Sequence, residues 1–394
     1  MRVALDVSAI PDDPAGAGIY VLELVKALDA LPPGSDLDLQ LVARNDDGER
    51  WRSVAPRATV HEVVPVRRPS RLAWEQMLAP RLAKHLEADV WHGPHYTIPL
   101  MMPQSRPSKQ QARSASVVTV HDLTFFDHPE WHERSKVAYF RPMIRAAARR
   151  AQVLIAVSDW TTRRLVELVG PRAAVVTIPH GVDHTRFLPS TDGLRTRDLA
   201  ALAGVGIRPP FIGFAGTIEP RKNIPSLVRS FDAIAGDHLG LQLAIVGQPG
   251  WGSEEVDRAI AKSRHRDRIN LTGYVEAEVI PALFRQATVV AYPSLEEGFG
   301  LPALEALACG APLVTTTGSA MEDVVGDAAV LVPPDDDASL TQALSQLVER
   351  AGRREALSLA GPPRAASSTW QRCAQLHLDA YRFAMARSTG KVEP

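Results

Sequence analysis

Two glutamates separated by seven residues are the strongest sign of chemistry in this sequence. Glu297 and Glu305 stand in the stretch from 291 to 312, which contains the run GFGLPALE. The stretch predicts a strand end, a glycine-containing loop and a helix with Pro302 near its first position. The N-terminus of such a helix suits a diphosphate, because it offers unpaired N–H groups and partial positive charge. Each carboxylate suits a vicinal diol, although helix capping by Glu297 and a surface ion pair at Glu305 explain either residue taken alone.

A second candidate segment, AGTIEPRKN at 215–223, follows an apolar strand and opens a helix. Arg221 and Lys222 in this segment are suited to neutralising a diphosphate, Arg221 through a planar fork and Lys222 as a point charge. Solvated cations at a helix end are the alternative. Ligands of open α/β sheets bind beyond the carboxyl ends of the strands, and both candidate segments stand at such ends.

The Glu-x7-Glu run with its interior GFGLPALE resembles the signature of glycosyltransferase family 4, a family of retaining, two-lobed nucleotide-sugar transferases. The resemblance implies that Glu305 binds the ribose hydroxyls of the donor and that Glu297 contacts the transferred sugar. It also implies that the loop and the first helical amides hold the phosphates. The residues concerned are Gly298, Phe299, Gly300 and Leu301.

The segment at 215–223 resembles the diphosphate-binding loop of the same family. Many relatives carry an arginine directly after the loop glycine, where this chain has Thr217. The first phosphate cation is therefore expected from Arg221, while Lys222 keeps its usual place. The variant GTxEPRKN resembles a subgroup rich in mannosyltransferases, which favours GDP-mannose as donor. Val275 stands where the family reads the nucleobase through backbone groups.

The first half of the chain contributes a loop and a histidine. Gly16 and Gly18 join the first strand to the first helix, where a plain tight turn is the commoner cause of such a pair. The resemblance places this loop beside the donor diphosphate and the acceptor. His121 ends an apolar strand; a core histidine satisfied by its neighbours is the alternative, but the resemblance assigns His121 a hydrogen bond to the donor sugar.

The elements that position these residues form a repeating pattern. Short β-rich runs alternate with helical patterns along the whole chain, which predicts parallel sheets built from strand-helix-strand units. A chain of 394 residues exceeds what one core usually organises. We therefore expect an α/β protein with two Rossmann-like doubly wound lobes. The resemblance to family 4 implies GT-B architecture, in which the two lobes face a central cleft.

Domain boundaries follow from shifts in composition. We predict an N-terminal lobe over 1–185, a linker over 186–209, a C-terminal lobe over 210–369 and a terminal helix over 370–386. The resemblance implies that the N-terminal lobe binds the acceptor, that the C-terminal lobe binds the donor, and that the terminal helix crosses back to the N-terminal lobe. The polar run at 101–116 predicts a surface loop, and the residues from 387 onward are expected to fray.

Composition limits the classes of partner. Forty-four basic residues balance 45 acidic ones, so the chain has no overall attraction to nucleic acid. Two cysteines without metal spacing, and no apolar run of about 18 residues, fit a cytoplasmic protein. Six basic residues between Arg134 and Arg150 are expected to form a solvated face, with peripheral membrane contact as the alternative. The acids at 335–337 are interpreted as helix caps rather than metal ligands, and no metal or cofactor is expected.

These motifs predict a retaining glycosyltransferase that moves a hexose from a nucleotide diphosphate sugar to a glycan or to a polyprenyl- or lipid-linked acceptor. His121, Arg221, Lys222 and Glu297 are the predicted catalytic residues. Two alternatives stay open: a sugar-nucleotide binding protein with weak catalysis, and a nucleotide-sugar epimerase. Detectable transfer would exclude the first, and epimerase action would appear without acceptor. A Rossmann dehydrogenase is disfavoured because the sequence has no GxGxxG followed by an acid.

Overall fold

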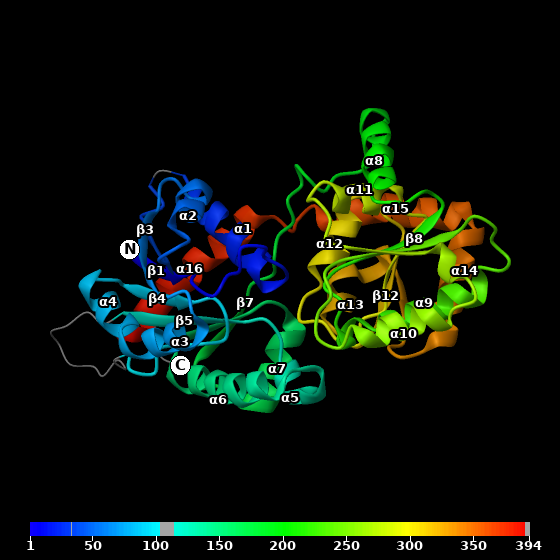
Figure 1. The fold of residues 1–394 in the computed structure, drawn as a ribbon. Coiled ribbons are helices and arrows are strands. Elements are labelled where there is room, and N and C mark those ends of the chain that lie inside the picture. The colour runs from blue at the N-terminus through cyan, green and yellow to red at the C-terminus, as the bar shows by residue number, and fades with distance from the viewer. Residues whose placement is uncertain (33, 103–113, 391–394) are drawn as a thin grey trace. The chain divides into compact units, whose positions relative to one another are not determined.

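The computed structural model describes residues 1–32, 34–102 and 114–390. The chain forms two compact units, Met1–Gly181 with Trp370–Pro394, and Val182–Thr369. Each unit contains a parallel β-sheet with helices on both faces (Figure 1). Positions 103–113 of the predicted surface loop and 391–394 of the predicted frayed end lie outside the described residues.

The sheet of unit 1 has seven strands in the order β3-β2-β1-β4-β5-β6-β7, all paired in parallel. The strands are β1 Arg2–Asp6, β2 Asp38–Arg44, β3 Thr59–Val64, β4 Val90–Gly93, β5 Ala115–Val120, β6 Val153–Ala156 and β7 Ala174–Thr177. The strand order reverses between β1 and β4, which creates the kind of switch point where open α/β sheets bind ligands.

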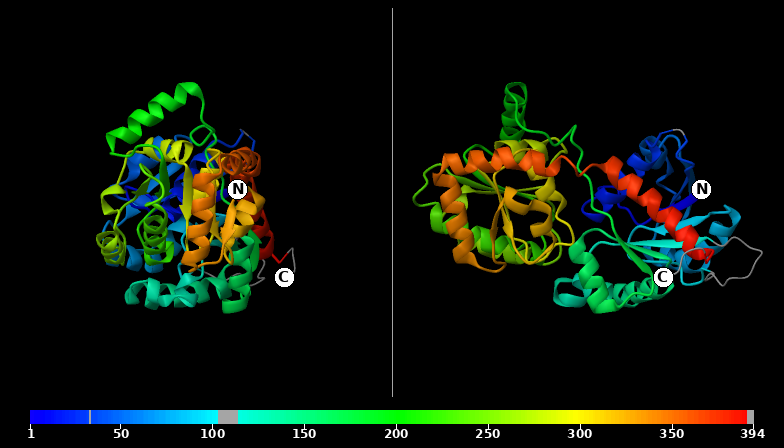
Figure 2. Two further views of the ribbon diagram at one scale, coloured as in Figure 1. Left: turned by 90° about the vertical axis from the view of Figure 1, so that its right-hand side faces the viewer. Right: turned by 180° about the vertical axis from the view of Figure 1, so that it is seen from behind.

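Apolar side chains on both faces of this sheet are covered by helices. The helices of unit 1 are α1 Ala17–Asp29, α2 Gly48–Val54, α3 Arg68–Met77, α4 Ala79–His85, α5 Thr124–Asp127, α6 Arg134–Arg150, α7 Asp159–Val169 and α16 Trp370–Ser388. One buried cluster joins α3 and α4 to β1 through β4, and another joins α6 and α7 to β5 and β6. The helices α1 and α16 pack on each other, and α16 also packs on β4, β5 and β6 (Figure 2).

A buried chain of hydrogen bonds attaches α16 to the sheet. His377 Nδ1 donates to the Cys373 carbonyl at 2.8 Å, so the neutral ring accepts at Nε2 from the Tyr20 hydroxyl, also at 2.8 Å. Tyr20 in turn bonds Thr119 on β5 at 2.9 Å. His92 on β4 completes the chain, with Thr119 at 2.9 Å and the Tyr381 hydroxyl at 2.8 Å. Each buried polar group therefore has a partner, which removes the main cost of burying it.

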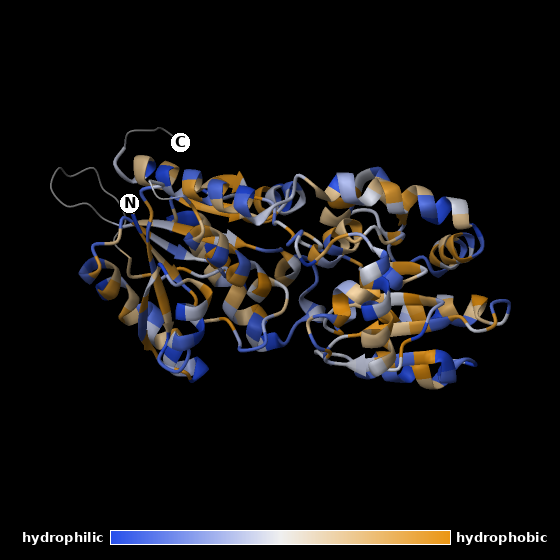
Figure 3. Ribbon diagram, turned by 90° about the horizontal axis from the view of Figure 1, so that it is seen from above, coloured by the Kyte–Doolittle hydropathy of each residue, from blue (hydrophilic) through white to orange (hydrophobic). Residues whose placement is uncertain are grey.

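The sheet of unit 2 has six parallel strands in the order β10-β9-β8-β11-β12-β13. They are β8 Phe211–Ala215, β9 Gln242–Val246, β10 Ile269–Gly273, β11 Val289–Tyr292, β12 Leu313–Thr316 and β13 Val330–Val332. Figure 3 shows hydrophobic residues concentrated in the strands, while the helices carry both polar and apolar positions. This pattern is expected of strands that are buried on both faces.

The helices of unit 2 fall into two groups by their contacts. They are α8 Asp192–Gly204, α9 Ile224–Ile234, α10 Glu254–Lys262, α11 Val279–Gln286, α12 Leu301–Ala308, α13 Ala320–Val325, α14 Asp337–Glu349 and α15 Ala351–Ala365. Helix α9 packs against α10 and α14, whereas α11 packs against α8 and α12. The two groups cover opposite faces of the sheet (Figure 1).

The segment predicted as a linker, 186–209, lies inside unit 2. Its helix α8 packs on α11, and Asp198 on α8 accepts hydrogen bonds from Arg285 at 2.6 and 2.7 Å. This buried ion pair explains why a stretch of polar composition belongs to the unit rather than to a flexible connection. The chain instead passes from unit 1 to unit 2 at Gly181 and returns after Thr369.

We expect the attachment of α16 to weaken on acidification. Burial lowers the pKa of His377 to about 4, while its bond to the Cys373 carbonyl opposes the shift. The unfolded chain binds this proton near pH 6.5, so the native state loses stability as the pH falls from that value toward about 4. The difference between the pKa values of His377 in the unfolded and native states corresponds to a loss of roughly 3 kcal/mol in the free energy of unfolding.

Hydrogen exchange of the α16 amides at pH 7 and pH 5, corrected for intrinsic rates, measures this effect. His377→Gln keeps an acceptor for Tyr20 without titrating, so its opening free energy should change less with pH than that of the wild type. His85→Gln, at an exposed position, should behave as the wild type. An equal pH dependence in His377→Gln would contradict the prediction.

Candidate active site

The loops that carry the predicted residues of unit 2 share one edge of its sheet. Because the strands are parallel, the loops after β8, β9 and β10 all leave at the same side. The Gly216 amide donates to the Val246 carbonyl at 2.9 Å, and the Gly247 amide donates to the Gly273 carbonyl at 3.0 Å. A side chain at Gly247 would collide with the carbonyl of Gly216. The structure therefore places Thr217, in the first of these loops, and Val275, after the third, at a single edge.

The loop between β11 and α12 is fixed to its neighbours by backbone contacts. The Leu295 amide donates to the Arg221 carbonyl at 2.8 Å, and the Ala320 amide donates to the Glu297 carbonyl at 3.3 Å. The loop ends at Gly300, whose φ of 98° puts it in the region that glycine favours. A Cβ there would also collide with Met321. The helix α12 starts at Leu301; Pro302 has no N–H, and the Ala303 amide donates to the Gly300 carbonyl at 3.0 Å, so Leu301 holds the first helical amide that has no acceptor within the helix.

Three of the predicted residues are in direct contact with one another. Glu297 accepts from Arg221 Nη1 at 2.5 Å through Oε2 and from Lys222 Nζ through Oε1. Arg221 Nε also donates to Glu219 at 2.9 Å. Burial alone would raise the pKa of Glu297, but attraction from Arg221 and Lys222 outweighs it and lowers the pKa to about 2. Glu297 is therefore ionised at neutral pH.

Glu305 lies on α12, one turn after the helix begins, and is half-buried. The ring of Tyr292, at the end of β11, links the environments of the two predicted glutamates. Burial, and then the charge of Glu305, raise the pKa of Tyr292, and Glu297 acts in the same direction. The Tyr292 hydroxyl donates to the Ala215 carbonyl at 2.6 Å. The charges of both carboxylates thus raise the pKa of Tyr292, at the strand end next to the candidate site.

In unit 1, His121 directly follows β5 and is buried. Its Nε2 donates to the Pro94 carbonyl at 2.8 Å, which leaves Nδ1 as the acceptor of a neutral ring. Burial lowers the pKa of His121, while Pro94 and Asp122 oppose the shift. The edge of the ring lies against Tyr20, with centroids 5.1 Å apart. A neutral His121 is thus equipped to accept a hydrogen bond from a hydroxyl group.

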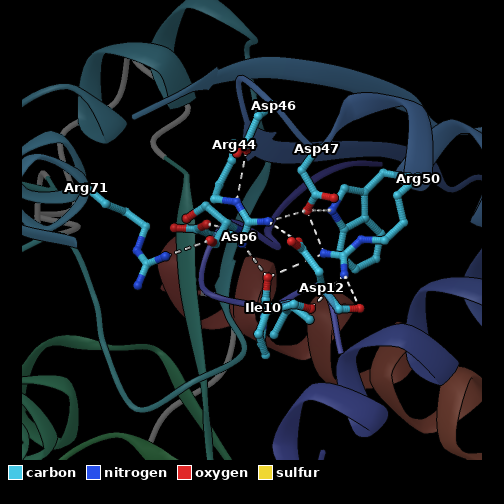
Figure 4. A network of polar contacts seen from close by, with 11 residues as sticks. Asp6, Ile10, Asp12, Arg44, Asp46, Asp47, Arg50 and Arg71 are labelled. Carbon is cyan, nitrogen blue, oxygen red and sulfur yellow. Dashed lines mark hydrogen bonds and ion pairs between the residues drawn. The ribbon is translucent and has the colours of Figure 1, made fainter. Parts of the chain in front are cut away.

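The loop between β1 and α1, which ends at Gly16, is held by two arginines (Figure 4). Arg44, at the end of β2, donates to the Ile10 carbonyl and to the Asp12 carboxylate, both at 2.6 Å. Arg50 donates to the Pro11 carbonyl at 2.7 Å. Gly18 lies in the first turn of α1, and a Cβ there would lie 2.9 Å from Pro14. Gly16 has a φ of 52° and open space around it.

A polar cluster at the end of β1 was not predicted from the sequence. Asp6 faces Arg71 of α3 (Figure 4), and Arg71 donates to the Ser8 carbonyl at 3.1 Å. Burial, and then repulsion from Asp6, raise the pKa of Glu75 to about 7. His95 Nδ1 is buried near this cluster, within electrostatic range of Arg71, and has no hydrogen-bond partner among the described residues. The sequence pattern that could have indicated this cluster is the single acid, Asp6, in the apolar run RVALDV.

The predicted residues thus form two groups, one in each unit. Unit 1 holds Gly16, Gly18 and His121. Unit 2 holds Thr217, Arg221, Lys222, Val275, Glu297, Gly298, Phe299, Gly300, Leu301 and Glu305. Glu219 joins the second group as an unpredicted partner of Arg221, since a contact between side chains two residues apart leaves no distinct sequence pattern.

Two other predictions, for residues 335–337 and 134–150, concern residues that lie at or in helices of the structure. Asp336 accepts from the Ser339 amide at 3.0 Å and caps α14, as predicted for this acid, whereas Asp337 is the first residue of the helix and pairs with Arg229. The basic region at 134–150 is the helix α6, but Arg141 on it donates to the Phe125 carbonyl at 2.6 Å and is not simply solvated. Within the described part of the chain, no helix has the length and apolar content needed to span a membrane.

Comparison with known proteins identifies the family to which this chain belongs. Residues 14–186 match the model of Glycosyltransferase Family 4, and residues 209–350 match that of Glycosyl transferases group 1. The chain is 25% identical to the O-antigen chain mannosyltransferase B of Escherichia coli, over 97% of this chain and 100% of that protein. It is 32% identical to a D-inositol 3-phosphate glycosyltransferase of Corynebacterium jeikeium, over 57% of this chain and 56% of that protein.

Among solved structures, the sucrose-phosphate synthase of Thermosynechococcus elongatus is similar with a TM-score of 0.78 and 21% identity, over 98% of this chain and all of that one. The two parallel-sheet, Rossmann-like units define a GT-B fold. The chain belongs to the glycosyltransferases of family 4, with a group 1 domain in its second unit.

We expect Gly300→Ala to destabilise the protein by about 1–3 kcal/mol, because a side chain at this positive φ is strained and meets Met321. The thermal unfolding midpoint should fall. Gly352→Ala is a matched control, since its added Cβ meets open space on α15. An unchanged midpoint in Gly300→Ala would show that the loop tolerates another conformation.

Proposed function

We propose that this protein is a retaining mannosyltransferase that uses GDP-mannose as its donor. The observation that carries the proposal is the contact between Glu297 and the cations Arg221 and Lys222, at the sheet edge where the N-terminus of α12 begins. This edge combines phosphate cations, helix amides and carboxylates that suit hydroxyl groups. The relative from Escherichia coli, named a mannosyltransferase, supports mannose as the transferred sugar.

The donor binds to unit 2 in this proposal. Arg221, Lys222 and the amides from Gly298 to Leu301 hold the diphosphate and stabilise the charge that develops on it during reaction. Glu305 binds the ribose hydroxyls, and Glu297 binds a hydroxyl of the transferred mannose. Backbone groups near Val275 contact the base, and Thr217 lines the phosphate loop. No metal or other cofactor is required, because these groups supply the positive charge.

The acceptor binds to unit 1, and His121 accepts a hydrogen bond from a hydroxyl of the donor sugar. The partly buried cluster of Asp6, Arg71 and Glu75 supports binding of a hydroxyl-rich acceptor, since its carboxylates accept hydrogen bonds while Arg71 donates them. Gly16 and Gly18 allow close approach of the loop backbone. The acceptor class is a glycan or a polyprenyl- or lipid-linked glycan. The exposed Arg134, Arg145 and Arg149 on α6 provide contact with an anionic membrane surface on the cytoplasmic side.

Transfer retains the anomeric configuration in this proposal. The acceptor oxygen bonds to the anomeric carbon on the face that the nucleotide leaves, and the bond from that carbon to the diphosphate oxygen breaks. The departing diphosphate oxygen accepts the acceptor proton, so no separate base is needed. Glu297 is assigned to a hydroxyl of the transferred sugar rather than to the anomeric carbon, so it is not a nucleophile in this proposal.

A ligand screen followed by product analysis tests the proposal. Thermal shift with GDP, UDP, ADP and their sugars should give the largest stabilisation with GDP and GDP-mannose. Mass spectrometry and NMR of the product formed with a glycan acceptor then report transfer and its anomeric configuration. Stabilisation by UDP alone would overturn the donor, an inverted product would overturn retention, and sugar conversion in donor-only samples would indicate epimerase action.

We expect Glu305→Ala to weaken GDP-mannose binding by about 10- to 100-fold, because hydrogen bonds to a charged group contribute about 1.5–3 kcal/mol each. Isothermal titration calorimetry measures the change. Glu355→Ala, at an exposed position on α15, should bind as the wild type. Unchanged affinity in Glu305→Ala would remove the ribose assignment.

We expect Lys222→Ala to slow transfer by about 10²–10³-fold, because the charge that Lys222 stabilises grows on the leaving diphosphate. Initial rates at saturating donor should fall much more than donor affinity does. Lys262→Ala, exposed at the end of α10, serves as the control. A loss confined to KM would mean that Lys222 contributes to ground-state binding only.

A further inference from the structure

Four charged side chains in unit 2 form one connected cluster. Its members are Glu219, Arg221, Lys222 and Glu297. Each oxygen of Glu297 bonds a different cation, Oε2 with Arg221 and Oε1 with Lys222. Arg221 bonds Glu219 as well, at 2.9 Å. Two cations and two carboxylates cancel, so these four groups present no net positive charge.

Burial makes the central contacts strong. Glu297 is 7% exposed and Lys222 is 6% exposed, whereas the side chain of Glu219 is 35% exposed. Charges that are shielded from water interact more strongly, and a charge that loses its partner there is costly. The pair of bonds from Glu297 therefore neutralises the two cations more effectively than the more exposed Glu219 does.

A diphosphate is expected to use the same two cations, and it carries at least two negative charges itself. If Glu297 stays in place, the phosphate groups meet cations that are already neutralised. The backbones of the two loops are joined by the bond from the Leu295 amide to the Arg221 carbonyl at 2.8 Å. The exchange of partners must therefore come from side-chain rotation rather than from separation of the loops.

We propose that Glu297 is an internal placeholder for the donor diphosphate, which displaces it from Arg221 and Lys222 and so releases its carboxylate to the transferred sugar. This inference rests on the proposed function, in that the donor binds to unit 2. An intact donor supplies hydroxyl groups to the released carboxylate. A nucleoside diphosphate without sugar supplies none, and it leaves a buried carboxylate without compensation.

Glu297 is thereby a specificity-determining residue that favours intact donor over spent nucleotide. After transfer, the sugar leaves the carboxylate, and Glu297 regains its cations as the nucleoside diphosphate departs. The low pKa of Glu297 agrees with this role, since the side chain stays anionic throughout the neutral range. The contact thus opposes inhibition by the product.

Calorimetric titration of GDP and of GDP-mannose into wild type and Glu297→Gln tests the inference. Glutamine keeps the shape but removes the charge that competes with phosphate. We expect Glu297→Gln to bind GDP at least fivefold more tightly than the wild type, and to reduce the preference for GDP-mannose over GDP at least tenfold. Equal or weaker GDP binding by Glu297→Gln would overturn the placeholder role.

Glu219→Gln is the matched control, because it removes a carboxylate from the same cation at a more exposed position. Its gain in GDP affinity should stay below twofold. A gain as large as that of Glu297→Gln would overturn the inference, because any lost negative charge would then suffice.

The two proposals fail in different ways. If wild type binds GDP-mannose but Glu297→Gln gains no GDP affinity, the placeholder role fails and the proposed function stands. If neither GDP nor GDP-mannose binds to the wild type or to the variants, both are overturned. Should Glu297→Gln not fold, Glu297→Asp takes its place: its shorter carboxylate cannot hold both cations in the present geometry, so GDP must bind more tightly than to the wild type, and unchanged affinity overturns the inference.

Discussion

Parallel pairing of the strands is the constraint on which the functional residues depend. When every strand runs in the same direction, each following loop must leave from the same edge, whatever its sequence. In unit 2 this brings the loops after β8, β9 and β10 close enough for backbone hydrogen bonds between Gly216, Gly247 and their neighbours. The loop after β11 joins them through Leu295. Side chains that are far apart in the sequence therefore meet at one edge without any further structural device.

The electrostatics of that edge differ from those of an open cation site. A site that offered bare lysine and arginine side chains would bind many anions, including inorganic phosphate. Here Glu297 holds both cations and Glu219 supplies a second carboxylate, so the four charges cancel. Burying charges costs free energy, and this cost is offset only while each charge keeps a partner. A ligand that displaces Glu297 must therefore contact both cations and also supply partners for the released carboxylate. Its shape matters for this as much as its charge.

Much of this structure follows from sequence patterns, and the exceptions have physical reasons. The alternation of strands and helices was predicted, because apolar periodicity marks elements such as β8, α10 and α11. The strand β3 gives a weak apolar signal, since only Val64 of its six residues is buried, and β13 has only three residues. The polar segment around α8 belongs to unit 2 because Asp198 forms an ion pair with Arg285, a contact that composition does not reveal.

In the candidate site, too, some features could be predicted from the sequence and others could not. The residue types and their placement at strand ends were predictable, because motifs and parallel topology determine them. The pairing of Lys222 with Glu297 spans 75 positions and depends on the exact paths of two loops. The bond from His121 to the Pro94 carbonyl likewise joins distant segments. Such contacts depend on side-chain conformation in the folded state, which a single sequence does not display.

The division of the chain has a consequence for its synthesis. Unit 2 is continuous, from Val182 to Thr369, whereas unit 1 needs α16 from the end of the chain. Without α16, Tyr20 and His92 would lose His377 and Tyr381, and the face of the sheet beneath would stay uncovered. A ribosome releases the N-terminal part first, and domains usually fold in that order. In this protein the order is reversed: unit 1 begins first but is completed only after unit 2, and its unfinished face needs protection until α16 has been synthesised.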